Sequence, residues 1–196
     1  MKKKLLFAFM LYSFVTFSQS KEKIYLINEN EKISKQQFEA LDKEKFYFTK
    51  IKNDSSIISI ANSRQKIIQL NPTQQSQISL YLDKIIGVNY DSTKKTMIHL
   101  YRKNQKIGND AEYKRYWSWI ESNSNKYQAF LLGSKNSKIV ENSKKHIFLD
   151  NDGLFENSFF SKSDFEINHI LIKPSGEVYV FYGMEDILNV LDKSVD

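Results

Sequence analysis

The stretch that most constrains the fold is residues 167–183, which reads as a strand, a tight turn and a second strand. Residues 170–172 form an unbroken apolar run, Ile-Leu-Ile, which is typical of a strand buried on both faces. Pro174 and Gly176 mark the turn, because proline presets its own φ and glycine tolerates a positive φ. The second strand alternates Val178, Val180 and Tyr182 with Glu177, Tyr179 and Phe181, so it has two different faces.

A helix is expected directly after this hairpin, from Met184 to Lys193. Ile187, Leu188 and Leu191 recur there at helical spacing and would form one apolar face. The chain is therefore predicted to end in a strand–strand–helix unit.

This unit, with Lys173-Pro174-Ser175-Gly176 at the turn and Gly183 after the second strand, resembles the C-terminal unit of thioredoxin-like proteins. The resemblance is to the secreted TlpA and peroxiredoxin-like type. Residues 96–102 resemble the strand that leads into the redox motif, and residues 126–132 resemble the next parallel strand. The resemblance covers about residues 94–193. It implies an α/β fold class, with a thioredoxin-like core in which helices flank a central mixed sheet.

The chain departs from that family where the family does its chemistry. It has no cysteine, and residues 102–108 read Arg-Lys-Asn-Gln-Lys-Ile-Gly where a Cys-x-x-Cys pair is expected. The proline that normally precedes the C-terminal strand is also missing, since Ile167 and Asn168 stand there. Thiol–disulfide exchange requires a thiolate that attacks a sulfur. The resemblance therefore implies a fold but no catalytic residue, and we expect no cofactor and no metal.

The N-terminus has the three regions of a secretory signal peptide. Lys2, Lys3 and Lys4 are followed by the apolar residues 5–17 and then by Ser18-Gln19-Ser20. A membrane anchor is the alternative, but this apolar run is short of the ~20 residues that a spanning helix needs. We expect residues 1–20 to be removed, leaving an exported protein, periplasmic or secreted, with no transmembrane span.

The charge of the chain does not indicate nucleic-acid binding. Removing residues 1–20 takes away three lysines and no acid, so the formal net charge falls from +6 to about +3. The remaining lysines are interspersed with acids, as in Lys43-Glu44-Lys45, and form no basic patch.

Residues 21–93 are predicted to be a small α+β extension and residues 94–196 the thioredoxin-like domain. The boundary is placed near Asp91–Lys95, and one continuous sheet is the alternative. The elements expected in the extension are strands at 23–27, 46–51, 56–61 and 66–70, a helix at 35–41 capped by Ser34, and a helix at 74–86 capped by Thr73.

The second part is expected to alternate strands and helices. Predicted strands cover 97–101, 127–132 and 147–149; helices cover 111–123, capped by Asn109-Asp110, and 154–160. This order favours parallel pairing through a crossover helix.

Candidate sites are few. Asp150-Asn151-Asp152-Gly153 begins like a calcium loop, but Phe155 and Ser161 stand where an EF-hand needs glycine and glutamate. The segment is better read as a turn. His99 and His169 lie in predicted core strands that could bring them together, and His146 stands apart from both; packing or hydrogen bonding is the expected role. Trp119 is either core or an exposed binding anchor.

These observations favour an exported, cysteine-free, thioredoxin-like protein that binds or scaffolds another protein of the bacterial cell envelope. One alternative is a non-redox enzyme with a polar site near His99, His169 and Asp150. Another is an exported protein of unrelated α+β fold.

Overall fold

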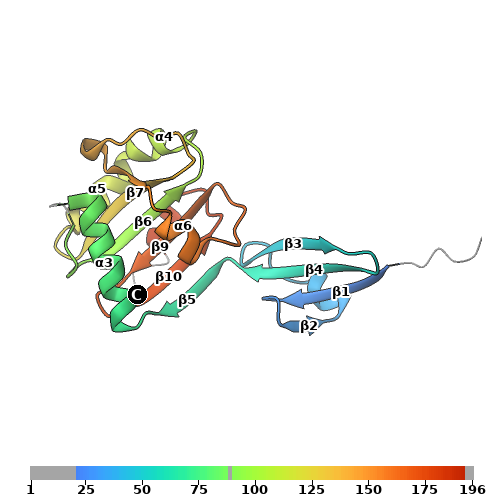
Figure 1. The fold of residues 1–196 in the computed structure, drawn as a ribbon. Coiled ribbons are helices and arrows are strands. Elements are labelled where there is room, and N and C mark those ends of the chain that lie inside the picture. Colours follow the sequence, from blue (N-terminus) through green and yellow to red (C-terminus); the bar gives the residue numbers. More distant parts are fainter. Residues whose placement is uncertain (1–20, 88–89, 193–196) are drawn as a thin grey trace, which may run out of the picture. The chain divides into compact units, whose positions relative to one another are not determined.

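The computed structural model describes residues 21–87 and 90–192, and the chain divides into two compact units (Figure 1). The first unit ends at Ser63 and the second begins at Arg64. The described residues form two mixed β-sheets and six α-helices, so the general α/β class is confirmed. The predicted signal peptide lies outside the described residues.

The first unit is a four-stranded sheet in the order β2-β1-β4-β3. Its elements are β1 (Glu22–Ile27), β2 (Glu31–Ile33), α2 (Lys35–Glu39), β3 (Phe46–Lys52) and β4 (Ser56–Ser63). Strand β1 pairs parallel with β4, while β2 and β3 pair antiparallel at the two edges. Strand β2 was not among the elements predicted from the sequence.

Helix α2 covers one face of this small sheet. Ser34 caps it as predicted, since its side chain accepts from the Gln37 amide and the Gln37 side chain accepts from the Ser34 amide. Phe38 of α2 packs against Tyr25 and Phe48, with ring centroids 5.1 and 5.2 Å away. These three rings form an aromatic cluster in the first unit, in which Phe48 is exposed and Tyr25 and Phe38 are partly buried.

The second unit is built on a six-stranded sheet in the order β5-β10-β9-β6-β7-β8. The strands are β5 (Gln65–Gln69), β6 (Lys95–Tyr101), β7 (Tyr127–Ser134), β8 (Ile147–Asp150), β9 (Ile167–Ile172) and β10 (Glu177–Tyr182). Strands β6, β7 and β8 are parallel; β9 runs antiparallel between β6 and β10, and β5 pairs antiparallel with β10. The predicted hairpin is confirmed, with Gly176 at φ 82° in its turn and β9 paired on both sides.

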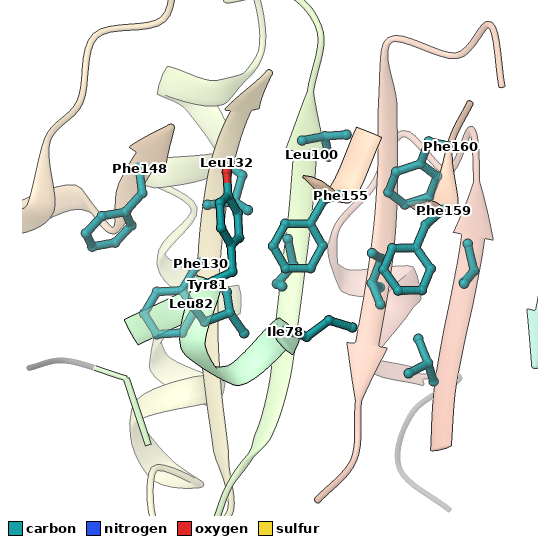
Figure 2. Close-up of a cluster of buried hydrophobic side chains, with 14 of the residues drawn as sticks. Ile78, Tyr81, Leu82, Leu100, Phe130, Leu132, Phe148, Phe155, Phe159 and Phe160 are labelled. Carbon is teal, nitrogen blue, oxygen red and sulfur yellow. The ribbon is translucent and has the colours of Figure 1, made fainter. Parts of the chain in front are cut away.

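Helices cover both faces of this sheet. The helices of this unit are α3 (Pro72–Ile86), α4 (Ile107–Ala111), α5 (Lys114–Ser122), α6 (Leu154–Phe159) and α7 (Leu188–Asp192). Figure 2 shows the first face, where side chains of α3 and α6 meet those of the strands. The labelled members are Ile78, Tyr81 and Leu82 from α3, Leu100, Phe130, Leu132 and Phe148 from the strands, and Phe155, Phe159 and Phe160 from α6 and its end.

The second face carries α4, α5 and α7. Their apolar residues pack on the alternate residues of the same strands: Met97, Tyr101, Ala129, Leu131, Leu171 and Phe181. Because successive residues of a strand point to opposite faces, each central strand contributes to both cores.

The boundary between the units differs from the predicted one. Sequence reading placed it near Asp91–Lys95, whereas the structure divides the chain between Ser63 and Arg64. The reason is that β5 pairs with β10 and α3 packs on the large sheet, so both belong to the second unit. Helix α3 also starts earlier than predicted, because Asn71 rather than Thr73 caps it and Pro72 takes its first turn.

The predicted helix 111–123 is shorter in the structure, where α5 covers Lys114–Ser122 and a separate helix, α4, ends at Ala111. In a continuous helix the carbonyl of Asp110 would accept from residue 114. Here it accepts from the Tyr113 amide at 3.2 Å and from the Trp117 indole N–H at 2.9 Å. Asp110 therefore lies within α4 and does not cap the longer helix.

The terminal helix begins at Leu188 and not at Met184, and its predicted end at Lys193 lies outside the described residues. The side chain of Asp186 accepts from the Leu188 amide at 2.9 Å and so caps this start. The carbonyls of Met184 and Glu185 accept from His169 and Lys106, two side chains that lie far away in the sequence. These long-range bonds replace the first turn of the predicted helix.

Candidate functional site

His99 and His169 meet at the centre of the large sheet. They stand directly opposite each other on the antiparallel strands β6 and β9. Their Nδ1 atoms are 2.7 Å apart and their rings cross at 72°, and neither residue has any exposed surface. The prediction that strand pairing could bring these two histidines together is confirmed.

The outer nitrogens of the pair complete a buried chain of hydrogen bonds. His169 Nε2 lies 2.7 Å from the carbonyl oxygen of Met184, and His99 Nε2 lies 2.6 Å from the hydroxyl of Tyr116 on α5. The Tyr116 hydroxyl also lies 3.9 Å from the sulfur of Met97. We call this set of hydrogen-bonded residues the histidine chain; in order along it they are Met97, Tyr116, His99, His169 and Met184.

The partners assign the direction of every bond in this chain. A carbonyl only accepts, so His169 must donate from Nε2, and in the neutral ring its Nδ1 must accept. His99 therefore donates from Nδ1 to His169, and its own Nε2 accepts the hydroxyl proton of Tyr116. One proton arrangement satisfies all four ring nitrogens with both histidines neutral.

Burial keeps the pair neutral. It lowers the pKa of His169 to about 4 and holds the pKa of His99 well below its ordinary value. The positive charge of Lys106 acts in the same direction on both rings, and His169 also lowers the pKa of His99. Burial likewise raises the pKa of Tyr116 well above its ordinary value, so the hydroxyl keeps its proton.

A buried carboxylate lies beside the histidine chain. Asp110 accepts from the Tyr101 hydroxyl at 2.7 Å and forms an ion pair with Lys106 at 3.1 Å. Lys106 also donates to the backbone carbonyl of Glu185. Asp110 is thus already compensated, and Lys106 joins α4 to the segment that follows β10.

A pocket of about 490 Å³ opens in the second unit beyond the C-terminal end of β6. Its lining comes from the chain after β6, the chain before and at the start of β9, the chain after β10, and the residue before β5. The residues are Arg64, Lys103, Gln105, Lys106, Asp164, Phe165, Glu166, Ile167, Gly183, Met184 and Glu185. This volume is in the range of small-ligand sites. Met184 belongs both to this lining and to the histidine chain.

Most charges in the pocket lining already have partners. Lys103 pairs with Glu166, and Arg64 donates to the carbonyls of Tyr182 and Gly183, with its guanidinium carbon 5.3 Å from the centroid of the Phe165 ring. The carboxylates of Asp164 and Glu185 accept no hydrogen bond and form no ion pair among the described residues. The pocket therefore presents two exposed carboxylates that have no cationic partner within residues 21–87 and 90–192.

Asp150 does not join the histidines. Its carboxylate accepts from the Tyr81 hydroxyl at 2.8 Å and from the Phe155 and Glu156 amides, both at 3.1 Å. Tyr81 lies on α3 and Phe155 on α6, so Asp150 points to the opposite face of the sheet from Tyr116. Burial raises the pKa of this carboxyl. The carboxylate stabilises the start of α6, which agrees with the predicted turn.

The other two candidates lie on the α5 side. Trp119 is half-buried and packs edge-on against Tyr127, with ring centroids 5.0 Å apart. His146, which was set apart from the other two histidines, stacks on Trp117 at 4.5 Å. Trp119 thus contributes to the core of the second face.

The residues that the structure describes offer no group of three or more histidine, cysteine, aspartate or glutamate side chains arranged for a metal ion. They also include no helix of the length and apolarity needed to cross a membrane. No side-chain nitrogen or oxygen buried within residues 21–87 and 90–192 lacks a hydrogen-bond partner.

Sequence reading missed most of this site. No sequence motif includes Lys106 or Glu185, and Asp110 was predicted to be a helix cap. One signal was available: Met97, His99 and Tyr101 alternate along β6 with apolar residues, which puts them on one face.

Comparison with known proteins adds no relative. No protein-family model matches the chain, and neither curated proteins nor solved structures include a match.

Proposed function

We propose that the protein is an exported binding protein of the bacterial cell envelope, with a cysteine-free, thioredoxin-like second unit. Its binding site would be the pocket at the end of β6, and its partner another envelope protein. The partner would place a cationic group at the mouth of the pocket, next to the carboxylates of Asp164 and Glu185.

The arrangement of the second unit supports the thioredoxin-like part of this proposal. The strand predicted to lead into the redox motif is β6, and its predicted parallel neighbour is β7. The predicted C-terminal hairpin, β9 and β10, lies in the same sheet beside β6, and α7 follows it. All four strands are thus adjacent in the order β10-β9-β6-β7.

The observation that carries the binding proposal is the pocket itself. It begins directly after β6, where the redox pair would stand in the resembled family, and it contains no sulfur nucleophile. Its lining instead combines an aromatic ring, Phe165, with side chains of both charges. Two of its carboxylates lack a cationic partner, which favours recognition of a positive group.

Binding is preferred over catalysis because the strongest candidates for acid–base chemistry are out of reach. His99 and His169 have no exposed surface, and all their ring nitrogens are engaged. Asp150 is buried on the other face of the sheet. A general base must come within hydrogen-bond reach of its substrate.

Site-specific photo-crosslinking tests the proposal. A photoreactive residue replaces Gln105, which is exposed and lines the pocket, and a matched variant carries it at Ser118, exposed on α5. Both full chains are expressed in the producing cell, and the envelope fraction is irradiated. We expect a discrete adduct with one protein from position 105 and none from position 118.

Charge removal provides the second arm. The double variant Asp164→Asn/Glu185→Gln should lower the adduct yield at position 105 about tenfold, which corresponds to ~1.4 kcal/mol of lost binding. The control is Glu121→Gln on the exposed surface of α5, which should leave the yield unchanged. Equal adducts from positions 105 and 118, or a yield that the double variant does not alter, would contradict the proposal.

A further inference from the structure

We infer that the histidine chain makes one wall of the pocket, Met184-Glu185, sensitive to acid: protonation of the buried pair displaces this wall and releases whatever the pocket holds. Release of a bound partner rests on the proposed function. The displacement itself does not, since it follows from the geometry of the chain.

A first added proton breaks the order of the chain. The only lone pairs on the two rings already accept hydrogen bonds, one from His99 and one from Tyr116. A proton on His99 Nε2 would face the Tyr116 hydroxyl, which must then turn its own hydrogen away. The remaining acceptor on that side is the Met97 sulfur at 3.9 Å, and a thioether is a weak acceptor.

A second proton is incompatible with the observed geometry. With both rings charged, each Nδ1 carries a hydrogen, and the two N–H groups would point at each other across 2.7 Å. The rings must then separate. Because both strands are paired on both sides, the rings have less freedom to move than the segment beyond β10.

Among the described residues, no nearby anion is free to compensate the new charge. From β6 and α4, Tyr101, Asp110 and Lys106 face the pair; from α5, Tyr116 does; and from the segment after β10, the Glu185 backbone is tied to Lys106. Asp110 is already paired, and Lys106 repels a positive ring. The neighbours of the pair in the sheet, Leu131 and Phe181, are apolar.

The hydrogen bond to the Met184 carbonyl favours the charged form of His169, but it offers nothing to the second charged ring. Water is therefore the remaining way to stabilise the doubly charged pair, and it would enter from the pocket. Met184 both lines the pocket and accepts from His169, so it is the layer between the solvent and the buried ring. Moving Met184-Glu185 outward would hydrate the ring. The same movement would disturb the Glu185 carboxylate that we propose for binding.

Methionine-methyl NMR of the exported chain tests this inference directly. After removal of residues 1–20, Met97 and Met184 are the two methionines that remain, and they lie at the two ends of the histidine chain. Both ¹³C-methyl signals are recorded from about pH 7.5 to about pH 3.5, a range that includes the pKa of about 4 to which burial lowers His169. We expect both signals to move with a common midpoint below the ordinary histidine pKa of ~6.5.

Two variants identify the titrating group. His169→Gln keeps an amide that can donate to the Met184 carbonyl but cannot be protonated, so it should abolish the movement of the Met184 signal. His146→Gln removes the third histidine, which stacks on Trp117 and makes no hydrogen bond to the histidine chain, and should leave the movement intact. A Met184 signal that is constant with pH in the wild type, or whose movement disappears only in His146→Gln, would overturn the inference.

Imidazole nitrogen shifts of the wild type keep the test decisive even if His169→Gln does not fold. At about pH 7.5 they should place the ring proton of His169 on Nε2 and that of His99 on Nδ1. Any other pair of tautomers would contradict the directions of the hydrogen bonds assigned to the histidine chain.

Crosslinking from position 105 at the same two pH values separates the inference from the proposed function. We expect the adduct yield to fall several-fold at about pH 3.5 in the wild type, and to fall less in His169→Gln over the same range. A constant adduct yield refutes the release. No adduct at either pH, together with a moving Met184 signal, removes the proposed function and leaves the acid-sensitive wall standing.

Discussion

Acidification should destabilise the whole second unit through the buried histidines, by an amount that the structure allows to be calculated. The pKa of His169 is about 4 in the folded protein and ~6.5 in the unfolded chain. The unfolded chain therefore takes up the proton first as the pH falls. Stability is fully present above pH ~6.5, is lost as the pH falls towards about 4, and is lost no further below that.

A pH of about 5 lies roughly 1.5 units below the pKa of His169 in the unfolded chain. Each of these units lowers the free energy of unfolding by ~1.4 kcal/mol. His169 alone should therefore lower the free energy of unfolding by about 2 kcal/mol between about pH 7.5 and about pH 5. His99, whose folded pKa is also lowered by burial, adds to this loss. The total is a large share of the ~5–15 kcal/mol that stabilises a domain.

Urea unfolding at both pH values, followed by tryptophan fluorescence, measures this loss. Trp117 and Trp119 both lie in the second unit, next to the histidine chain, and report on its unfolding. The matched variant is His99→Gln/His169→Gln. It retains all the carboxylates of the protein, but it lacks the two buried histidines that titrate. Its loss over the same range should be smaller than that of the wild type by at least about 2 kcal/mol. Equal losses in the two proteins would refute the claim that the pair is neutral and buried.

Three other predictions concern single positions. Leu171→Ala, at a fully buried residue of β9, should lower the free energy of unfolding by ~2–5 kcal/mol, whereas Leu80→Ala, at a residue 66% exposed on α3, should cost under ~0.5 kcal/mol in the same denaturation assay. Asp150→Ala leaves three donors without their acceptor and should cost about 2–4 kcal/mol, against a near-zero change for the exposed Asp152→Ala; similar losses for the two would show that Asp150 does not stabilise α6. The exported chain should begin near Lys21, and an intact mass that still includes residues 1–20 would contradict the signal-peptide prediction.

The sequence was sufficient where one local pattern agrees with the tertiary structure. The run at 170–172 belongs to a strand paired on both sides, and the Pro-Ser-Gly turn fixes its hairpin with β10. Ser34 caps α2 for the same reason, because a capping box involves residues only three positions apart. Such features depend on neighbours in the sequence, so they can be read from it.

The unit boundary could not be read in this way. Strand β5 looks like its predecessors β3 and β4 in composition, and its assignment depends on β10, more than 100 positions later. The chain between β4 and β5 is a single residue, Arg64, with no glycine, proline or serine-rich linker to indicate a change of unit. A boundary defined by strand pairing leaves no trace in local composition.

The candidate site was partly predictable. The pairing of His99 with His169 follows from the order and register of β6 and β9, which the resemblance suggested. The same reasoning wrongly added Asp150, because alternation along a short strand does not say which face a residue at its end will take. The pocket was not foreseen at all, since its lining comes from four separate places in the second unit.

One cause connects the errors in secondary structure with the missed site. The late start of α7 and the break between α4 and α5 both occur where backbone carbonyls accept from side chains: Met184 from His169, Glu185 from Lys106, and Asp110 from Trp117, which lies beyond the next helical turn. A carbonyl that accepts from a distant side chain is less available to the helical amide four residues later, so local propensity fails at these positions. The first of these bonds, from His169 to Met184, also joins the buried histidines to the pocket wall. The places where helical periodicity fails to predict this chain are therefore the places where its core is connected to its surface.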